Sequence, residues 1–160
     1  MAGGDLREGE VTLPFDPAAA EGDARLVFIG TIASPWNDRA TCPHNLREAR
    51  ERGGGATLFI DPPYRPGLVG LDGKSHIVLL YWLHLARRDI IVARPNHADS
   101  TRGVFSLRSP VRPNPIGLAT VRMLALDIET GRIEIEAIDC LDGTALIDIK
   151  PYLPAVDAAG

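Results

Sequence analysis

Short apolar runs separated by turn residues dominate the hydrophobic pattern of this chain. Runs rich in β-branched and aromatic residues are typical of strands, and they occur at residues 26–32, 56–60, 77–85, 89–93, 103–107, 118–126 and 132–138. In the last run Ile133, Ile135 and Ala137 alternate with glutamates, which predicts a strand with one buried face and one wet face. The short loop before it ends at Gly131, so the last two runs are predicted to form a hairpin.

Only residues 45–52 have helical character, and that segment is short and charged. Many short strands, 13 prolines and 16 glycines predict an all-β fold, an antiparallel barrel or sandwich. A doubly wound α/β domain is disfavoured, because crossovers between parallel strands need helices of about ten residues or more. The glycines at 53–55 lack the lysine of a phosphate-binding loop, and we interpret them as a flexible hairpin loop.

A length of 160 residues suits one domain, which we place at residues 25–154. Residues 1–24 hold six acids, one base and no sustained apolar period, so we predict a mobile acidic tail there, and a second tail at 155–160. The longest apolar run, 77–85, is less than half of the roughly 20 residues that span a bilayer. Since no secretion signal precedes it, we expect a cytoplasmic protein without a membrane partner.

The net charge of −4 argues against a protein that holds nucleic acid by bulk positive charge. Residues 84–122, however, contain seven arginines against two aspartates: Arg87, Arg88, Arg94, Arg102, Arg108, Arg112 and Arg122. The planar guanidinium suits phosphate and carboxylate groups. This arginine block has two interpretations, a solvated rim of surface charge or a face that binds anions or RNA.

Three prolines at positions 110, 113 and 115 stiffen the segment that follows Arg108. Such a segment can form a corner between two strands, or it can hold Arg108 and Arg112 in a set geometry around a ligand. The Asp142-Gly143 pair predicts a turn. No serine or cysteine lies in a nucleophile motif.

The histidines and cysteines show no paired spacing of the kind zinc sites use, so we expect no metal; they are His44, His76, His84, His97, Cys42 and Cys140. His84 follows the aromatic pair Tyr81-Trp82. It is either a core histidine on an apolar strand or part of the wall of a ligand pocket.

Four motifs occur in a fixed order along the chain. They are Ser-Pro-Trp at 34–36, Gly-Leu-Asp-Gly-Lys-Ser-His at 70–76, Gly-Val-Phe-Ser-Leu-Arg-Ser-Pro-Val-Arg-Pro-Asn-Pro-Ile-Gly at 103–117, and Asp-Gly-Thr-Ala-Leu-Ile-Asp-Ile-Lys-Pro-Tyr at 142–152. Together they resemble the TsaA-like family, whose best-known members are the TrmO-type tRNA methyltransferases. The resemblance covers residues from about 25 to 154.

This resemblance implies a small single-sheeted β-barrel that binds S-adenosylmethionine and acts as a homodimer. It implies methylation of the exocyclic nitrogen of threonylcarbamoyladenosine in tRNA. By motif, the implied cofactor contacts are Asn45, Arg47, Leu83, His84, Arg108, Leu118, Ile138 and Asp139. The chain departs from the family at Asn45-Leu46-Arg47, where relatives often have Gln-Pro-Gly, and at Ala145, where they often have proline. We expect a short form without the extra C-terminal domain of longer members, and therefore weaker binding of tRNA.

Methyl transfer from a sulfonium needs positioning rather than a metal, so a site without a triad suits it. Arg108 suits the methionine carboxylate, and either Tyr81 or Trp82 could face the sulfonium, since strand alternation lets only one point inward. We hypothesise that Asp139, just before the Asp-Gly turn, accepts the proton of the acceptor nitrogen. For tRNA we expect contacts from Arg87, Arg88, Arg112 and Lys150.

Two other functions stay open. One is a barrel that binds S-adenosylmethionine or RNA as a regulatory or adaptor module, and the other is a methyltransferase with a different acceptor. The acidic net charge favours these alternatives, whereas the arginine block favours RNA.

Overall fold

A computed structural model of the chain describes residues 5–20, 22–96 and 98–159. The chain divides into two compact units. The larger consists of residues 26–82 and 117–160, and the smaller of residues 1–25 and 83–116. Each unit is built around its own β-sheet.

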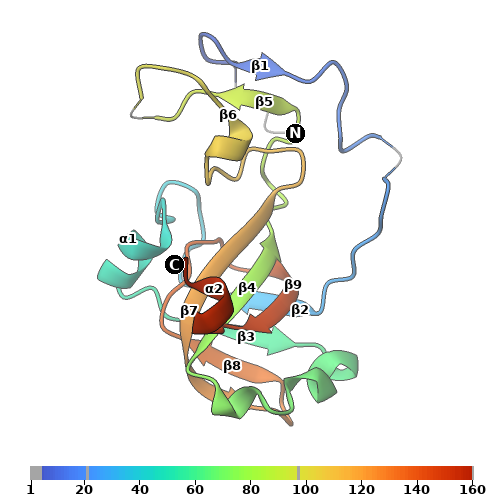
Figure 1. Ribbon diagram of the computed structural model, residues 1–160, viewed down its shortest axis with the longest axis vertical. Coiled ribbons are helices and arrows are strands. Elements are labelled where there is room, and N and C mark those ends of the chain that lie inside the picture. Colours follow the sequence, from blue (N-terminus) through green and yellow to red (C-terminus); the bar gives the residue numbers. More distant parts are fainter. Residues whose placement is uncertain (1–4, 21, 97, 160) are drawn as a thin grey trace. The chain divides into compact units, whose positions relative to one another are not determined.

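The larger unit is a closed β-barrel (Figure 1). Its strands follow the order β2-β3-β8-β7-β4-β9 around the barrel. Their bounds are β2 Gly30–Ala33, β3 Ala56–Ile60, β4 His76–Trp82, β7 Ile116–Asp127, β8 Arg132–Ile135 and β9 Thr144–Pro151. The pairings β2·β3, β3·β8, β7·β8, β4·β9 and β2·β9 are antiparallel. The predicted all-β antiparallel barrel is therefore confirmed.

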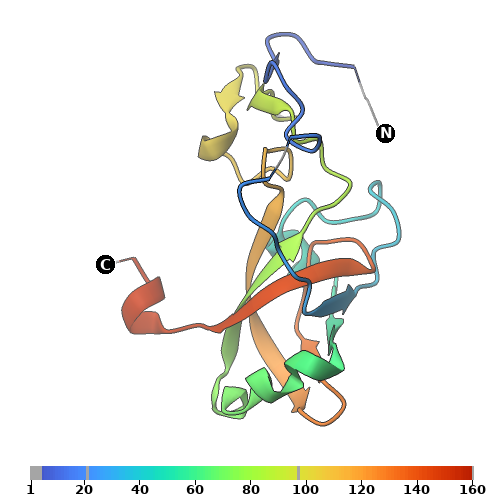
Figure 2. The same cartoon turned by 90° about the vertical axis from the view of Figure 1, so that its right-hand side faces the viewer.

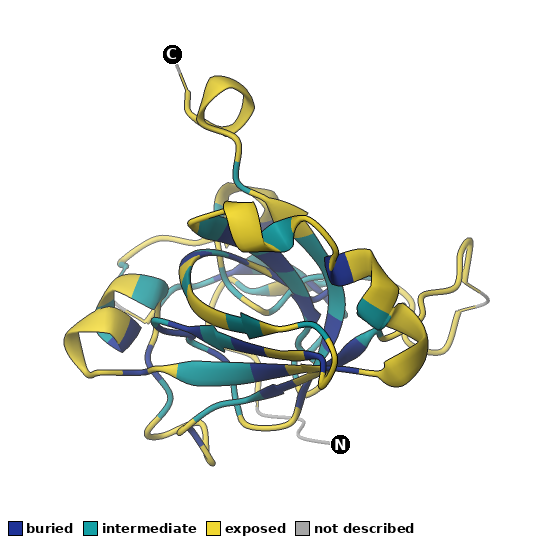
Figure 3. Ribbon diagram, turned by 90° about the horizontal axis from the view of Figure 1, so that it is seen from below, coloured by how far each residue is buried: buried dark blue, intermediate teal, exposed yellow. Residues whose placement is uncertain are grey.

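Alternation along the strands fills the barrel. Ile77, Leu79 and Tyr81 of β4 are buried, whereas the residues between them are half-exposed, and Ile133 and Ile135 of β8 repeat the pattern. Fully burying one such aliphatic side chain stabilises the fold by about 1.5–3 kcal/mol. In Figure 3 the buried stretches lie mainly on the strands, whereas the short helices are mostly exposed.

The hairpin predicted around Gly131 is confirmed, because β7 and β8 pair on either side of it and its φ is 71°. The Asp142-Gly143 turn is confirmed as well: Gly143 has a φ of 74°, and β9 begins at the next residue. Left-handed backbone of this kind favours glycine, because it lacks a Cβ.

Short helices lie between the barrel strands, and one follows the last strand. They are α1 Leu46–Glu51, the 3₁₀ helices η1 Pro62–Leu68 and η2 Leu71–Gly73, and α2 Pro154–Asp157, into which β9 leads (Figure 2). The helical prediction for 45–52 is confirmed in α1. Asn45 caps this helix, because its Oδ1 accepts a hydrogen bond from the Glu48 amide at 3.0 Å.

The smaller unit holds a second sheet of order β1-β5-β6, formed by Val11–Thr12, Ile90–Ala93 and Arg102–Gly103. The expectation of a single sheet is thereby corrected. Mobility of residues 1–24 stays a prediction, but Val11 and Thr12 within that range are a strand paired with β5. The backbone amide of Arg94 donates to Glu10 Oε1 at 3.0 Å, which fixes this segment at β5.

Several details of the predicted elements were wrong, and one is that β4 ends at Trp82, short of the predicted residue 85. Residues 26–29 precede β2 rather than belong to it, and β8 ends at Ile135, short of residue 138. The predicted strand 103–107 is mostly the 3₁₀ helix η3, Val104–Ser106, because Arg112 donates to the carbonyls of Val104 and Leu107 and curls that segment. Strand β9 was not predicted, since its acids and Lys150 obscure its alternation.

The glycines at 53–55 are not a hairpin loop, because they join α1 to β3. A Cβ on Gly54 would lie 2.7 Å from the Trp36 ring and 2.9 Å from the Ala49 carbonyl oxygen. Gly54 therefore permits close packing rather than flexibility.

Candidate functional site

Asp139 lies on the segment that connects β8 to β9, half-buried between the buried residues Ile138 and Cys140. Its Oδ1 accepts a hydrogen bond of 2.9 Å from the hydroxyl of Tyr81 on β4. Strand alternation turns Tyr81 inward, where it is 3% exposed, and leaves Trp82 half-exposed. Of these two aromatic residues, Tyr81 is therefore the one that points into the barrel.

Gly117 on β7 makes room for the Tyr81 ring. A Cβ on Gly117 would collide with three ring carbons of that tyrosine. Gly117, the last residue of the proline-rich motif, thus allows the Tyr81 ring to lie where its hydroxyl can donate to Asp139.

The Ser-Pro-Trp motif is tied to the segment 138–143 by hydrogen bonds. Ser34 Oγ donates to the Cys140 carbonyl at 2.7 Å, and the Ser34 amide donates to Asp142 Oδ1 at 3.0 Å. The Asp142 amide in turn donates to the Trp36 carbonyl at 2.8 Å. Two motifs about 100 residues apart in sequence therefore form one hydrogen-bonded structure beside Asp139.

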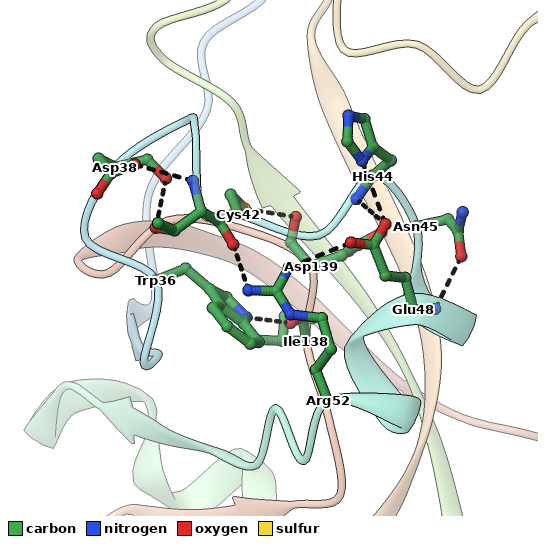
Figure 4. Close-up of polar contacts among 10 residues, drawn as sticks. Trp36, Asp38, Cys42, His44, Asn45, Glu48, Arg52, Ile138 and Asp139 are labelled. Atoms are coloured by element: carbon green, nitrogen blue, oxygen red, sulfur yellow. Dashed lines mark hydrogen bonds and ion pairs between the residues drawn. The ribbon is translucent and has the colours of Figure 1, made fainter.

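Trp36 is the centre of a second group of contacts (Figure 4). Its indole Nε1 donates to the Ile138 carbonyl at 2.7 Å, and the Arg52 guanidinium lies 4.4 Å from the centre of its ring. A guanidinium over an indole face is attracted by the ring's quadrupole. Arg52 also donates to the Thr41 carbonyl at 2.7 Å and to Glu48 Oε1 at 3.1 Å.

Glu48 joins this group to the loop before α1. Its Oε2 accepts from the His44 amide at 2.9 Å and lies 3.2 Å from His44 Nδ1. These hydrogen bonds keep the pKa of the Glu48 carboxyl below its ordinary value, and the bond from the His44 amide contributes most. Cys42 on the same loop donates through Sγ to the Asp139 carbonyl at 3.4 Å. The loop 37–45 is thus held at its C-terminal end by Glu48 and in its middle by Arg52 and Asp139.

Both cysteines are free thiols. Burial raises the pKa of Cys140 to about 12, and burial together with the nearby Asp139 charge raises the pKa of Cys42. A thiol with a raised pKa is a poor nucleophile at neutral pH. Neither cysteine is therefore suited to nucleophilic catalysis.

The predicted cofactor contacts fall in both units. In the barrel unit, Asp139 directly follows Ile138, and Leu118 is exposed on β7. Asn45 caps α1, and Arg47 is exposed on that helix, with its Nε 3.7 Å from Glu51 Oε1. The smaller unit contains Leu83, His84 and Arg108. The Leu83 amide donates to the Pro115 carbonyl at 2.8 Å, and Arg108 is exposed. His84 is exposed in the turn after β4, so its interpretation as a core histidine was wrong.

The predicted tRNA contacts have intramolecular partners. Arg87 pairs with Asp89 at 2.7 Å, Arg88 donates to the Pro113 carbonyl at 2.6 Å, and Lys150 pairs with Asp148 at 2.8 Å. Arg112 donates to the carbonyls of Val104 and Leu107. Arg112 therefore has a structural role that neither interpretation of the arginine block included, and its contact with tRNA stays a prediction.

Sequence reasoning missed the contacts made by Arg52, Glu48 and Trp36. The Ser-Pro-Trp motif marked Trp36, and the Asn-x-x-Glu spacing at 45–48 is a helix-capping signal that would have marked Glu48. No local pattern marked Arg52, because its partner Trp36 is a tertiary neighbour.

Within the described residues, no group of three or more histidine, cysteine or acidic side chains is placed to hold a metal ion. His97, which belonged to the metal expectation, lies outside the described residues. None of the helices formed by the described residues has the length and apolar character needed to cross a membrane.

Comparison with known proteins gives consistent similarities. The family described as "tRNA-methyltransferase O N-terminal domain" matches residues 31–158. The probable S-adenosyl-L-methionine-binding protein VirR of Rhizobium radiobacter is 42% identical over 146 residues, covering 91% of this chain and 79% of VirR. A probable S-adenosyl-L-methionine-binding protein of Methanothermobacter thermautotrophicus is 40% identical, covering 86% of this chain and 96% of that protein.

The putative S-adenosylmethionine-dependent methyltransferase RcsF of Pseudomonas aeruginosa is 39% identical, covering 81% of this chain and 57% of RcsF. Among solved structures, a crystal structure of TrmO has a TM-score of 0.71 at 33% identity, with 87% of this chain and 62% of that one covered. TrmO from Pseudomonas aeruginosa has a TM-score of 0.67 at 32% identity, with 87% of this chain covered. The chain therefore spans about 60% of the length of the TrmO structures it matches.

Proposed function

Because the chain belongs to the family of tRNA-methyltransferase O N-terminal domains, we propose that it is an S-adenosylmethionine-dependent methyltransferase that acts on tRNA. The observation that carries this proposal is the family match over residues 31–158. Relatives at 42% and 40% identity are named for S-adenosylmethionine binding, and one at 39% is named as a methyltransferase.

The donor set around Asp139 fits this cofactor. One lone pair of Asp139 Oδ1 accepts from Tyr81, which orients the carboxylate and leaves lone pairs on both oxygens for an amino or hydroxyl donor and for a proton. S-adenosylmethionine carries such donors on its ribose, its adenine and its methionine ammonium. Asp139 and the adjoining Ile138 backbone are therefore proposed as the part of the cofactor site that the barrel supplies, and Asn45, Arg47 and Leu118 as its further barrel contacts.

When bound, the cofactor supplies a methyl group that is electrophilic without any metal. The protein then has to position the acceptor and remove its proton. In the threonylcarbamoyladenosine proposed as acceptor, the exocyclic nitrogen is conjugated to the ring and to a carbonyl, so it is a weak nucleophile until its proton leaves. Asp139 is the proposed proton acceptor, acting through the oxygen that Tyr81 does not use.

The smaller unit supplies the remaining proposed contacts. Leu83, His84 and Arg108 are proposed for the cofactor, with the Arg108 guanidinium suited to its carboxylate. Arg87, Arg88 and Arg112 in this unit, and Lys150 in the barrel, are proposed for tRNA. A homodimer that works in the cytoplasm completes the proposal, since two copies would double the number of arginine blocks that meet one tRNA.

One observation favours a second function. Several relatives, including two that this chain matches over most of their length, are named only as S-adenosylmethionine-binding proteins. A binding protein with a regulatory role would share the cofactor site and would lack turnover.

The deciding experiment uses the purified chain with tRNA that carries threonylcarbamoyladenosine and cofactor labelled in its methyl group. The enzyme proposal expects label in the modified nucleoside, identified by mass spectrometry after nuclease digestion, and calorimetric binding of the cofactor. Binding without transfer to any tRNA would establish the second function instead. Transfer to another nucleoside would retain the enzyme and reject the acceptor.

A further inference from the structure

Phe105 is the most exposed aromatic side chain among the described residues, at 81% of its surface. It stands on η3 in the smaller unit, three residues from Arg102 and three from Arg108, and both arginines are exposed. A phenylalanine that is 81% exposed gains little from burial on folding. The exposed Arg102, three residues away, distinguishes this ring from other singly exposed apolar side chains.

The turn beneath Phe105 is firmly held. Val104 is fully buried, packed in a core with Ile90 and Ala93. The Leu107 amide donates to the Val104 carbonyl at 3.1 Å, and Ser106 Oγ donates to the Gly103 carbonyl at 2.8 Å.

Arg112 completes this support from the proline-rich segment. Its guanidinium donates to the carbonyls of Val104 and Leu107 at 2.7 and 2.8 Å, on either side of Phe105. The aromatic ring is thus displayed on backbone that loses little entropy when a partner binds.

The charge around the ring favours an anionic partner. Residues 83–116 carry six arginines and two aspartates. The acidic N-terminal segment enters the sheet through β1, which pairs with β5 on the side opposite β6. Its Glu8 and Glu10 contact Arg94, which directly follows β5. Arg102, on β6, is therefore on the sheet edge away from β1.

We propose that Phe105 is a stacking platform for an unpaired base of RNA, with Arg102 contacting a flanking phosphate. Aromatic rings beside cationic side chains are the general means by which proteins hold single-stranded nucleic acid, because every base has a π face. This inference rests on the proposed tRNA substrate, and it assigns part of the RNA contact to a residue outside the cofactor site.

The test measures RNA binding directly, by fluorescence anisotropy with a labelled anticodon stem-loop and the full-length chain. Phe105→Ala should weaken binding by about 5-fold to 100-fold. Phe105→Trp should bind within about 3-fold of the parent, whereas Phe105→Leu, which keeps apolar bulk without a π face, should resemble alanine. Arg102→Ala should also lower the salt dependence, reducing the slope of log K against log salt by about 0.7–0.9.

Phe15→Ala is the matched control, because Phe15 is also exposed but is followed by Asp16. It should bind RNA as the parent does. Cofactor binding by calorimetry should be unchanged in all these variants, which separates the platform from the cofactor site.

Parent-like RNA binding by Phe105→Ala would overturn the platform while leaving the methyltransferase proposal intact. Analytical ultracentrifugation gives a second way to overturn the platform. If Phe105→Ala lowers the molecular mass while RNA binding per subunit is unchanged, the ring belongs to a contact between copies of the chain. RNA binding that depends on Phe105 in a chain that transfers no methyl group would retain the platform and reject the proposed function.

Discussion

The hydroxyl of Tyr81 donates a 2.9 Å hydrogen bond to Asp139 Oδ1, and this contact joins β4 to the segment between β8 and β9. It leaves Asp139 with one oriented oxygen and one available oxygen, which is the arrangement proposed for its role as proton acceptor.

Replacing the carboxylate should therefore separate chemistry from binding. Asp139→Asn keeps an acceptor for Tyr81 but is not a base, so methyl transfer should fall by about 100-fold or more, in single-turnover assays. Tyr81→Phe keeps the base and loses its orientation, so a smaller loss is expected, with unfolding free energy lower by about 1–2 kcal/mol. Asp72→Asn, at an exposed carboxylate on η2, is the control. Full activity of Asp139→Asn with unchanged cofactor affinity would remove Asp139 from the mechanism.

Arg52 should position the loop 37–45 through Trp36, Thr41 and Glu48. Because these contacts are partly exposed, Arg52→Ala should cost only about 1–2 kcal/mol in denaturant unfolding. Cofactor affinity should fall as well, since the loop carries Asn45. Arg52→Lys keeps the charge without the planar fork and should recover part of the loss. Arg132→Ala, at an exposed arginine on β8, should change neither quantity.

Two adjacent glycines should respond differently to a single methyl group. A Cβ at Gly54 would press on the Trp36 ring and the Ala49 carbonyl, so Gly54→Ala should lower the unfolding free energy by about 1–3 kcal/mol. At Gly55 the nearest atoms would be 3.7 Å away, so Gly55→Ala should be tolerated. Thermal unfolding of the pair checks this, and equal effects at both positions would show that backbone conformation matters more than the space beside Trp36.

The raised pKa of Cys140 predicts a loss of stability in alkali. Below pH 9.0, the ordinary thiol pKa, the Cys140 thiol is neutral in both the folded and the unfolded chain, so it does not change the stability with pH. Above that pH the thiol ionises in the unfolded chain, whereas in the folded chain it stays protonated up to about pH 12. The unfolding free energy should therefore fall with a slope of up to about 1.4 kcal/mol per pH unit across that range from this group. Urea titrations at several pH values should show a shallower slope for Cys140→Ala than for the parent. Parallel slopes would contradict the assignment.

Local patterns predicted much of the barrel. Alternation marked Ile133 and Ile135, the Asp142-Gly143 pair marked the entry to β9, and Asn45 marked the start of α1. These features depend on backbone preference and on which side of a strand faces water, and both are determined by residues close in sequence. The ordered motifs further established the family.

Only the tertiary structure decided which side chains meet. Tyr81 donates a hydrogen bond to Asp139, 58 residues later in the sequence, and the Arg52 guanidinium lies over the Trp36 ring. Arg112 donates to a carbonyl of η3. Each contact depends on how the barrel closes or how a loop packs, because distant segments become neighbours only when apolar surface is buried between them. The sequence by itself determined most of the barrel strands, two of the turns and the family. Packing determined which arginine supports the fold and which aromatic ring stays exposed.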